Sequence, residues 1–305
     1  MGAVARHAIQ LRKLMNRRTF SQCMMGTAGA LLVPDWASAS LTSREVRFSV
    51  MLWTLETHDS FDRAIDIVAE AGYQGVELVG EFQKWPPEKK RQVMAQMRSR
   101  KLVFDSMSGV KTGFAVPQES DSFLAQFAAQ LQAAKELECP QVILLSGNRA
   151  NDLTVEAQRS VAIENLKRAA EMAARVSIEI LIEPIDFLEN PSIFLATVRD
   201  GFEIVQAVNA PNVKVLYDFY HEQRSFGNLL EKLEKNIDKI GLIHVADVPG
   251  RHEPGTGEID YATIYRKLAE IHYDRWIAME FYPTHDPVAS LAQARVSAQQ
   301  AMRTA

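Results

Sequence analysis

Residues 178–183 read IEILIE, and this stretch decides the fold class. Isoleucine and leucine dominate it, so it predicts a strand that is buried on both faces, as in a parallel sheet covered by helices. The preceding stretch 161–176, VAIENLKRAAEMAARV, has apolar side chains at the spacing of an amphipathic helix. A helix followed by a buried strand is the unit from which α/β folds are built.

The same alternation of a short apolar run and a longer helical pattern repeats along the chain after about residue 45. Eight such units in roughly 255 residues are the number and size of a closed (β/α)₈ barrel, or TIM barrel. We therefore expect a single α/β barrel domain over residues 40–305. An open doubly wound sheet is the alternative, but no glycine-rich GxGxxG turn follows the first strand. The predicted strands are 46–53, 75–79, 102–107, 141–146, 178–183, 213–218, 240–246 and 276–281, with helical patterns at 61–72, 123–137 and 161–176.

The bulk composition fits one large domain that does not bind nucleic acid. The chain has 305 residues, 47% of them hydrophobic, which is ample for a single barrel core. Beyond residue 39 it has 29 basic and 37 acidic residues, and an acidic body lacks the cations that binding to phosphates requires. With only Cys23 and Cys139 present, a disulfide framework is excluded for the body.

Residues 1–39 have the pattern of an export signal. The twin arginine Arg17-Arg18 precedes a weakly apolar run that ends in the small-residue cleavage pattern ASA. This arrangement resembles a twin-arginine signal peptide, which implies the twin-arginine export machinery as a partner and a periplasmic or exported protein. Met15 is a natural start for such a signal, so residues 1–14 read as a mis-assigned start. The apolar run is too short and interrupted for a stable membrane span.

Four predicted strands in the second half of the chain carry a metal-capable side chain within two residues of their last position. These residues are Glu183, Asp218, His244 and Glu280. Taken singly, each has an ordinary explanation, such as capping a helix or pairing with a lysine. Four successive strands that each deliver an oxygen or nitrogen donor to one rim are a different signal, because the carboxyl ends of barrel strands form the active-site face.

A divalent metal ion is the cofactor that this set predicts. Three carboxylates repel one another strongly at a rim of low dielectric, and a cation supplies the counter-charge. Three carboxylates and one imidazole suit Mn²⁺, Mg²⁺, Co²⁺ or Zn²⁺, with positions left for water or substrate.

The segment after the seventh predicted strand adds candidate substrate contacts. Residues 244–261 read HVADVPGRHEPGTGEIDY, a turn-rich connection that contains Arg251. The guanidinium group of Arg251 suits a carboxylate or a pair of hydroxyls, or forms a surface ion pair. His221 follows three residues after the sixth strand and lies near the same mouth. Trp53 and Phe82, near the ends of the first two strands, are candidates for a pocket wall or for the core.

These motifs together resemble the hydroxypyruvate isomerase family, which belongs to the wider set of xylose-isomerase-like barrels. The likeness runs over roughly residues 46–285. It rests on E-P, DxxH, H…PGRxEPGxGxIDY and E-[FY] along the last four strands. The specific stretches are FSVMLW (48–53), AGYQGVELVGEF (71–82), EPI (183–185), YHEQRSFGNL (220–229) and PGRHEPGTGEIDY (249–261).

The resemblance implies roles for two sets of residues. The four strand-end residues would be the metal ligands, and Glu183 and Glu280 among them would also form the acid/base pair. The substrate would contact His221, Glu189 and Arg251. The implied reaction is a proton transfer through a metal-stabilised enediolate, such as the conversion of hydroxypyruvate to tartronate semialdehyde.

The residue at position 244 leaves the identity of the substrate open. Bacterial hydroxypyruvate isomerases tend to carry Gln where this chain has His244, whereas the ketose 3-epimerases carry His. A ketose 3-epimerase, or another sugar isomerase or lyase on the same site, is therefore the alternative. A non-catalytic exported sugar-binding barrel and a nuclease of the same fold are less favoured. The sequence leaves open whether the chain forms a homo-oligomer.

Overall fold

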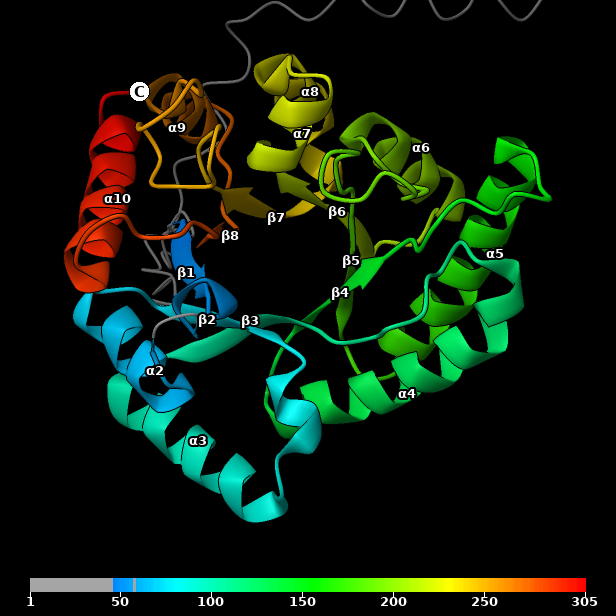
Figure 1. Ribbon diagram of the computed structural model, residues 1–305, viewed down its shortest axis with the longest axis horizontal. Helices are drawn as coiled ribbons and strands as arrows, with labels where there is room; N and C mark the ends of the chain where they lie inside the picture. Colours follow the sequence, from blue (N-terminus) through cyan, green and yellow to red (C-terminus); the bar gives the residue numbers. More distant parts are fainter. Residues whose placement is uncertain (1–45, 57–58) are drawn as a thin grey trace, which may run out of the picture. The chain divides into compact units, whose positions relative to one another are not determined.

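The computed structural model describes residues 46–56 and 59–305, so the predicted export signal over residues 1–39 lies outside the described residues. Eight parallel strands close into a barrel in the order β1 to β8 (Figure 1). The (β/α)₈ barrel predicted from the sequence is confirmed. The strands are β1 (Arg47–Met51), β2 (Gly75–Val79), β3 (Val103–Ser108), β4 (Gln141–Leu145), β5 (Glu179–Glu183), β6 (Val213–Asp218), β7 (Ile240–Val245) and β8 (Trp276–Met279).

The observed strands begin and end within two residues of the predicted ones. The largest differences are at the ends of β1 and β8. Trp53 begins the short helix α1 (Trp53–Glu56) instead of ending a strand. Glu280 lies one residue beyond the last paired residue of β8, but its backbone N–H still donates to the carbonyl of Val245 at 3.0 Å. Trp53 and Glu280 thus lie where the chain leaves the barrel wall.

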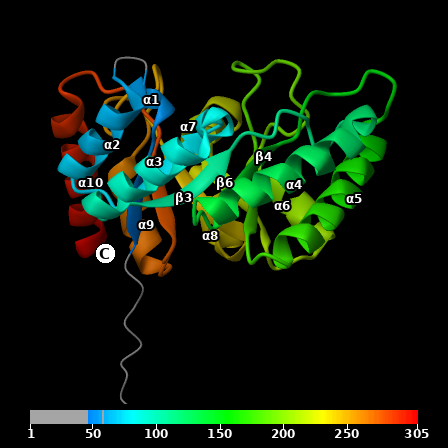
Figure 2. The ribbon, with the colours of Figure 1, turned by 90° about the horizontal axis from the view of Figure 1, so that it is seen from below.

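Helices surround the strands as a ring, as Figures 1 and 2 show from two directions. The last helix packs against the ninth and the second, which closes the ring beside β1. None of the described helices is long and apolar enough to cross a membrane. The helices are α2 (Phe61–Glu70), α3 (Pro87–Arg100), α4 (Ser120–Glu136), α5 (Val155–Ala174), α6 (Val198–Val208), α7 (Phe219–Ser225), α8 (Leu229–Asn236), α9 (Tyr261–Glu270) and α10 (Pro287–Arg303), with 3₁₀ turns η2 (Glu81–Lys84), η3 (Pro117–Glu119) and η4 (Ile237–Lys239).

Side-chain caps explain where several of these helices begin. The hydroxyl of Ser60 accepts a hydrogen bond from the backbone N–H of Arg63 at the start of α2, and Thr154 does the same for α5 through Ala157. The α5 helix therefore starts at Val155, six residues before the apolar pattern from which it was predicted. Its first turn is mostly exposed, so it carries no apolar periodicity.

A layer of apolar side chains fills the barrel below its rim. It consists of Ile143, Leu181, Leu216, Leu242, Trp276 and Ala278, all buried. Successive strand residues point to opposite faces, so the next inward positions lie two residues further along each strand. On β5 to β8 those positions are Glu183, Asp218, His244 and Glu280. Because the side-chain direction repeats every two residues, all four polar side chains point inward one layer above the apolar one, at the mouth of the barrel.

Gly75 on β2 marks a close approach inside the barrel. A Cβ atom at this position would lie 2.7 Å from Cζ3 of Trp276 and 2.9 Å from Cβ of Ser49. Neither neighbour is the flexible end of a long side chain, so a methyl group has no room. Glycine at this position lets the indole ring of Trp276 reach across the barrel.

We expect Gly75→Ala to destabilise the fold by about 1–3 kcal/mol, the usual cost of overpacking. Trp276→Phe removes Cζ3 and Cη2, the ring atoms that the new methyl group would meet. The double variant should therefore be less destabilised than the sum of the two single variants. Chemical unfolding of all four proteins measures this coupling, and strictly additive effects would contradict the proposed clash.

Candidate active site and metal centre

The four predicted metal donors converge at the rim of the barrel. Glu183 ends β5, Asp218 ends β6, His244 lies one residue before the end of β7, and Glu280 directly follows β8. One donor atom of each lies within 4.8 Å of the others, and all four side chains are buried. Four successive strands thus deliver three carboxylates and one imidazole to a single point.

Asp218 uses its two oxygens differently. Oδ1 accepts hydrogen bonds from the backbone N–H groups of Tyr220 at 2.7 Å and His221 at 3.3 Å, which caps α7. Oδ2 is buried and has no hydrogen-bond partner within the described part of the chain. The nearest cationic groups to Oδ2, on His221 and Arg251, both stand at 3.5 Å. One oxygen therefore builds the local fold while the other remains available at the centre.

His244 lies among three carboxylates. Its Nδ1 is 2.7 Å from Oε2 of Glu280 and 3.9 Å from Oε1 of Glu183, and its Nε2 is 2.9 Å from Oε2 of Glu77. Burial alone would lower the pKa of His244, but the charges of Glu77 and Glu280 outweigh burial and raise it. The ring thus presents one nitrogen to the rim and the other to the barrel interior.

Glu183 and Glu280 occupy opposite electrostatic environments. Burial raises the pKa of Glu183 to about 8, against the opposing charge of His244. Burial acts in the same direction on Glu280, but the charges of Arg251 and His244 outweigh it and lower the pKa of this carboxyl below its usual range. Two carboxyl groups held at one site with pKa values pushed apart are typical of an acid/base pair.

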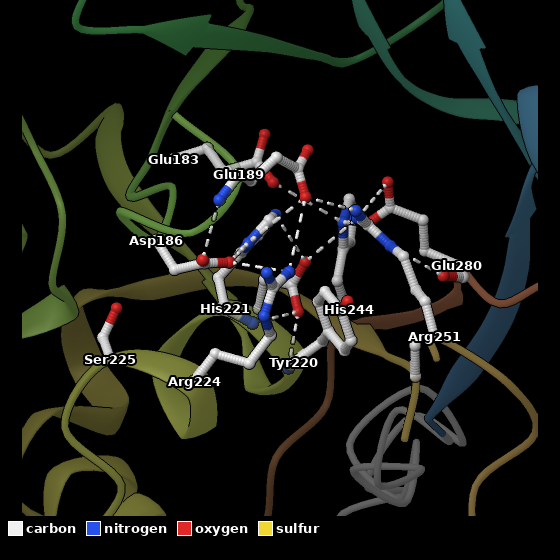
Figure 3. A network of polar contacts seen from close by, with 12 residues as sticks. Glu183, Asp186, Glu189, Tyr220, His221, Arg224, Ser225, His244, Arg251 and Glu280 are labelled. Atoms are coloured by element: carbon white, nitrogen blue, oxygen red, sulfur yellow. Dashed lines mark hydrogen bonds and ion pairs between the residues drawn. The ribbon is translucent and has the colours of Figure 1, made fainter. Parts of the chain in front are cut away.

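Arg251 is the fixed cation of the site. Its Nη2 lies 2.7 Å from Oε1 of Glu280, and its Nη1 lies 3.1 Å from Oε2 of Glu189 (Figure 3). The guanidinium carbon lies over the rings of Trp53 and Tyr220, at 5.3 and 4.9 Å from their centroids. Trp53 Nε1–H also donates to Oε1 of Glu280 at 3.1 Å.

The connection after β7 is built to hold Arg251 in place. The buried carboxylate of Asp247 accepts hydrogen bonds from the backbone N–H groups of Val248, Gly255 and Ile259. A Cβ on Gly257 would lie 2.0 Å from the carbonyl oxygen of Val248, so only glycine fits there. Asp247 thus ties both ends of this connection to the barrel.

A second polar group lies beside the first. Nδ1 of His221 is 2.7 Å from Oδ2 of Asp186, and Nη1 of Arg224 is 3.1 Å from the same oxygen (Figure 3). Burial would lower the pKa of His221, but the charge of Asp218 and the hydrogen bond to Asp186 raise it to about 9. The carboxylate of Glu189 is half exposed and faces Arg251 and His221.

The structure brings together the residues that the sequence singled out and adds others. His221, Arg251 and Glu189 all lie at the mouth, as expected. Of the two aromatic candidates, Trp53 contacts the site, whereas Phe82 is buried in the outer core. Sequence reasoning missed Glu77, Asp186, Arg224 and Tyr220. A lone acid within the apolar run GVELV was the available signal for Glu77.

The donor set fits a divalent cation. Oxygen and imidazole donors in this proportion suit first-row divalent metals and Mg²⁺. The buried Oδ2 of Asp218 lacks a hydrogen bond among the described residues, and leaving such an oxygen unpaired is costly. A cation at the convergence point would give that oxygen a partner and would offset the repulsion among the carboxylates.

Several known proteins are similar to this chain over most of its length. Hydroxypyruvate isomerase of Escherichia coli (strain K12) is 29% identical over 251 residues, covering 81% of this chain and 97% of the relative. The 2-oxo-tetronate isomerase of Cupriavidus necator is 29% identical over 249 residues, covering 80% and 96%. The solved structure of an AP endonuclease, family 2, from Brucella melitensis is 26% identical with a TM-score of 0.76, covering 82% of this chain and 98% of that one.

These findings confirm the resemblance to hydroxypyruvate isomerases that the motifs indicated, since both curated relatives are named isomerases. A family model described as xylose isomerase-like TIM barrel matches residues 65–303. Because that match spans most of the chain, this protein belongs to the xylose isomerase-like TIM barrel family.

Proposed function

We propose that this chain is a metal-dependent isomerase that moves a proton next to the carbonyl of a short hydroxylated substrate. The observation that carries the proposal is the convergence of Glu183, Asp218, His244 and Glu280, buried and within 4.8 Å of one another. The pKa values of two of the three carboxyl groups, Glu183 and Glu280, are shifted in opposite directions. A site of this kind combines a place for a cation with the means to hold and return a proton.

One divalent ion, Mn²⁺, Mg²⁺, Co²⁺ or Zn²⁺, is the proposed cofactor. The four converging residues would hold it, with Nδ1 as the donor atom of His244. When bound, the ion supplies positive charge beside the carbonyl and hydroxyl oxygens of the substrate, where negative charge develops as the proton leaves.

Glu183 and Glu280 are the proposed acid/base pair. They come from β5 and β8, with two strands between them, so their carboxyl groups approach the centre from different sides of the mouth. Arg251, Trp53 and His244 stabilise the charge of Glu280, whereas burial favours the protonated form of Glu183. One of the pair can therefore take the substrate proton while the other delivers one to the neighbouring position.

Arg251, His221 and Glu189 are the proposed substrate contacts. The two aromatic rings and the carboxylates of Glu189 and Glu280 hold the guanidinium group of Arg251 in place, which limits the entropy lost on binding. The hydrogen bond to Asp186 orients the ring of His221 and leaves Nε2 directed toward Oδ2 of Asp218. The half-exposed Glu189 is able to accept hydrogen bonds from substrate hydroxyls.

The substrate class we propose is the short hydroxylated 2-oxo acids. Hydroxypyruvate and 2-oxo-tetronate, the compounds in the relatives' names, both belong to it. A ketose 3-epimerase is the second candidate, favoured by the imidazole of His244 among the donors. A nuclease, suggested by the name of the Brucella protein, is disfavoured by the acidic body of this chain.

For the N-terminus we propose a twin-arginine signal over residues 1–39 ahead of a barrel domain over 40–305, which makes the mature protein periplasmic or exported. The pair Arg17-Arg18 and the apolar run behind it support this proposal. The twin-arginine route transports folded proteins, which suits a barrel loaded with metal before export.

The metal proposal is tested with Asp218→Asn. This change keeps Oδ1, which caps α7, and removes the charge at the centre. We expect about one equivalent of divalent metal per wild-type chain, and most of it lost in the variant without a large change in the melting temperature. Elemental analysis of purified protein measures the metal. Asp186→Asn is the matched control, because it removes a charge from the neighbouring group and should retain the metal.

The acid/base proposal is tested with Glu183→Gln and Glu280→Gln. Each keeps an oxygen donor and loses the titratable group, so kcat should fall by about 10²–10⁴-fold. Turnover of hydroxypyruvate, 2-oxo-tetronate and common ketoses, together with exchange of the substrate α-proton in deuterated water, is followed by NMR. Glu189→Gln serves as a comparison and should act mainly on KM. A metal-loaded Gln variant with wild-type turnover would show that the residue is a ligand only.

The export proposal is tested with a reporter fused after residue 45. The wild-type segment should carry the reporter to the periplasm, and Arg17→Lys with Arg18→Lys should retain it inside the cell. Arg6→Lys with Arg12→Lys makes the same chemical change outside the pair and should leave export intact. Export that survives in the first double variant would rule out the twin-arginine route.

A further inference from the structure

We propose that Glu77 is a positioning residue of the metal centre: it holds the ring of His244 so that Nδ1 faces the donor set. The inference rests on the proposed metal site and adds a residue that lies on the opposite side of the barrel. Glu77 is not one of the four donors and contacts the site through His244, so it would act through that residue.

Glu77 points into the barrel from the middle of β2. Gly75, two residues earlier, faces Trp276 inside the barrel, and the strand period gives Glu77 the same inward direction. The side chain is completely buried, and its Oε2 lies 2.9 Å from Nε2 of His244. The two residues are 167 positions apart in the sequence, so only closure of the barrel brings them together.

The contact determines which nitrogen of His244 is available to a cation. A neutral imidazole carries one proton, and the nitrogen that keeps it cannot bind a metal. Both ring nitrogens face carboxylates: Nε2 lies 2.9 Å from Glu77, and Nδ1 lies 2.7 Å from Glu280 and 3.9 Å from Glu183. Glu77 lies outside the four donors, so a cation held by those donors would take the place of a proton on Nδ1, whereas Nε2–H would still donate to Glu77. Carboxylates that hold metal-binding histidines in this way are widespread in metal sites.

The energetics favour this role over a purely structural one. Burying a carboxylate costs several kcal/mol unless partners compensate it. Oε1 of Glu77 has no hydrogen-bond partner in the described ranges, so the contact with His244 is the hydrogen bond that offsets the burial. An apolar side chain would serve the barrel interior better, as Leu181 and Leu242 do in the same interior.

A neighbouring acid provides the control. Asp105 on β3 is also completely buried inside the barrel, but its Oδ2 accepts a hydrogen bond from Ser49 Oγ at 2.8 Å. Burial and the charge of Glu77 raise the pKa of Asp105 to about 8. Asp105→Asn therefore removes an acidic side chain that is buried in the same part of the barrel interior, but it leaves the carboxylate that faces His244.

Metal affinity is the first measurement. In Glu77→Met, which has no acceptor for Nε2–H, the Kd for Mn²⁺ should rise by about 10–100-fold. Glu77→Gln keeps an amide oxygen and nearly the same shape, so its Kd should lie between those of Glu77→Met and the wild type. Asp105→Asn should stay within about threefold of the wild type, well below the loss expected when the partner of a metal-binding histidine is removed. At saturating Mn²⁺ the kcat of Glu77→Gln should recover, because the acid/base residues are intact.

The second measurement is independent of activity. In Zn²⁺-loaded protein labelled with ¹⁵N-histidine, His244 should show a slowly exchanging Nε2–H proton in the wild type and in Asp105→Asn. This signal should be lost in Glu77→Met. Wild-type Mn²⁺ affinity in both Glu77 variants, or a proton assigned to Nδ1 of His244 in the wild type, would overturn the inference. If Glu77→Met does not fold, the affinity of Glu77→Gln decides. Wild-type protein that binds no Mn²⁺ would instead reject the metal site itself.

Discussion

Glu183, Asp218 and Glu280 place three carboxylates in one small buried volume, where like charges repel far more strongly than they do in water. Several features of the mouth offset this repulsion among the carboxylates. Arg251 approaches Glu280 and Asp218, and burial shifts Glu183 toward its protonated form. The cation that we propose at the convergence point would complete the compensation, which links the stability of the rim to the chemistry of the site.

The need for a fixed cation also explains the long connection between β7 and α9. A lysine on a simple turn would bring a charge to the rim, but it would not hold that charge in one plane. Arg251 instead contacts the rings of Trp53 and Tyr220 and donates through Nε to the backbone carbonyl of Glu280. The hydrogen bonds of Asp247 hold the backbone around it. The loop is thus a rigid support for one guanidinium group.

The sequence predicted the eight strands and the four rim residues for the same reason. A buried parallel strand is a continuous apolar run, and barrel topology sends the carboxyl end of every strand to one rim. Glu77 escaped prediction because β2 is buried on both faces for most of its length, so the run GVELV does not show which of its side chains point into the barrel. Asp186 escaped because its partners come from α7, a contact that no local pattern encodes.

The mouth has two chemically different halves, and this division bears on how a substrate would lie. The inward positions at the ends of β5 to β8 carry charged or titratable groups, whereas those at the ends of β2 and β4 carry the exposed apolar side chains Val79 and Leu145. Leu145 is paired in register with Glu183, so the apolar half begins directly beside the proposed acid/base pair. A substrate with one carbonyl end would place that end over β5 to β8, because the four donors, His221 and Arg251 lie there. Its remaining carbons would lie toward Val79 and Leu145. Specificity for chain length would then depend on β2 and β4, away from the four donors, so that substrates of different length could be accommodated without changing the proton-transfer residues.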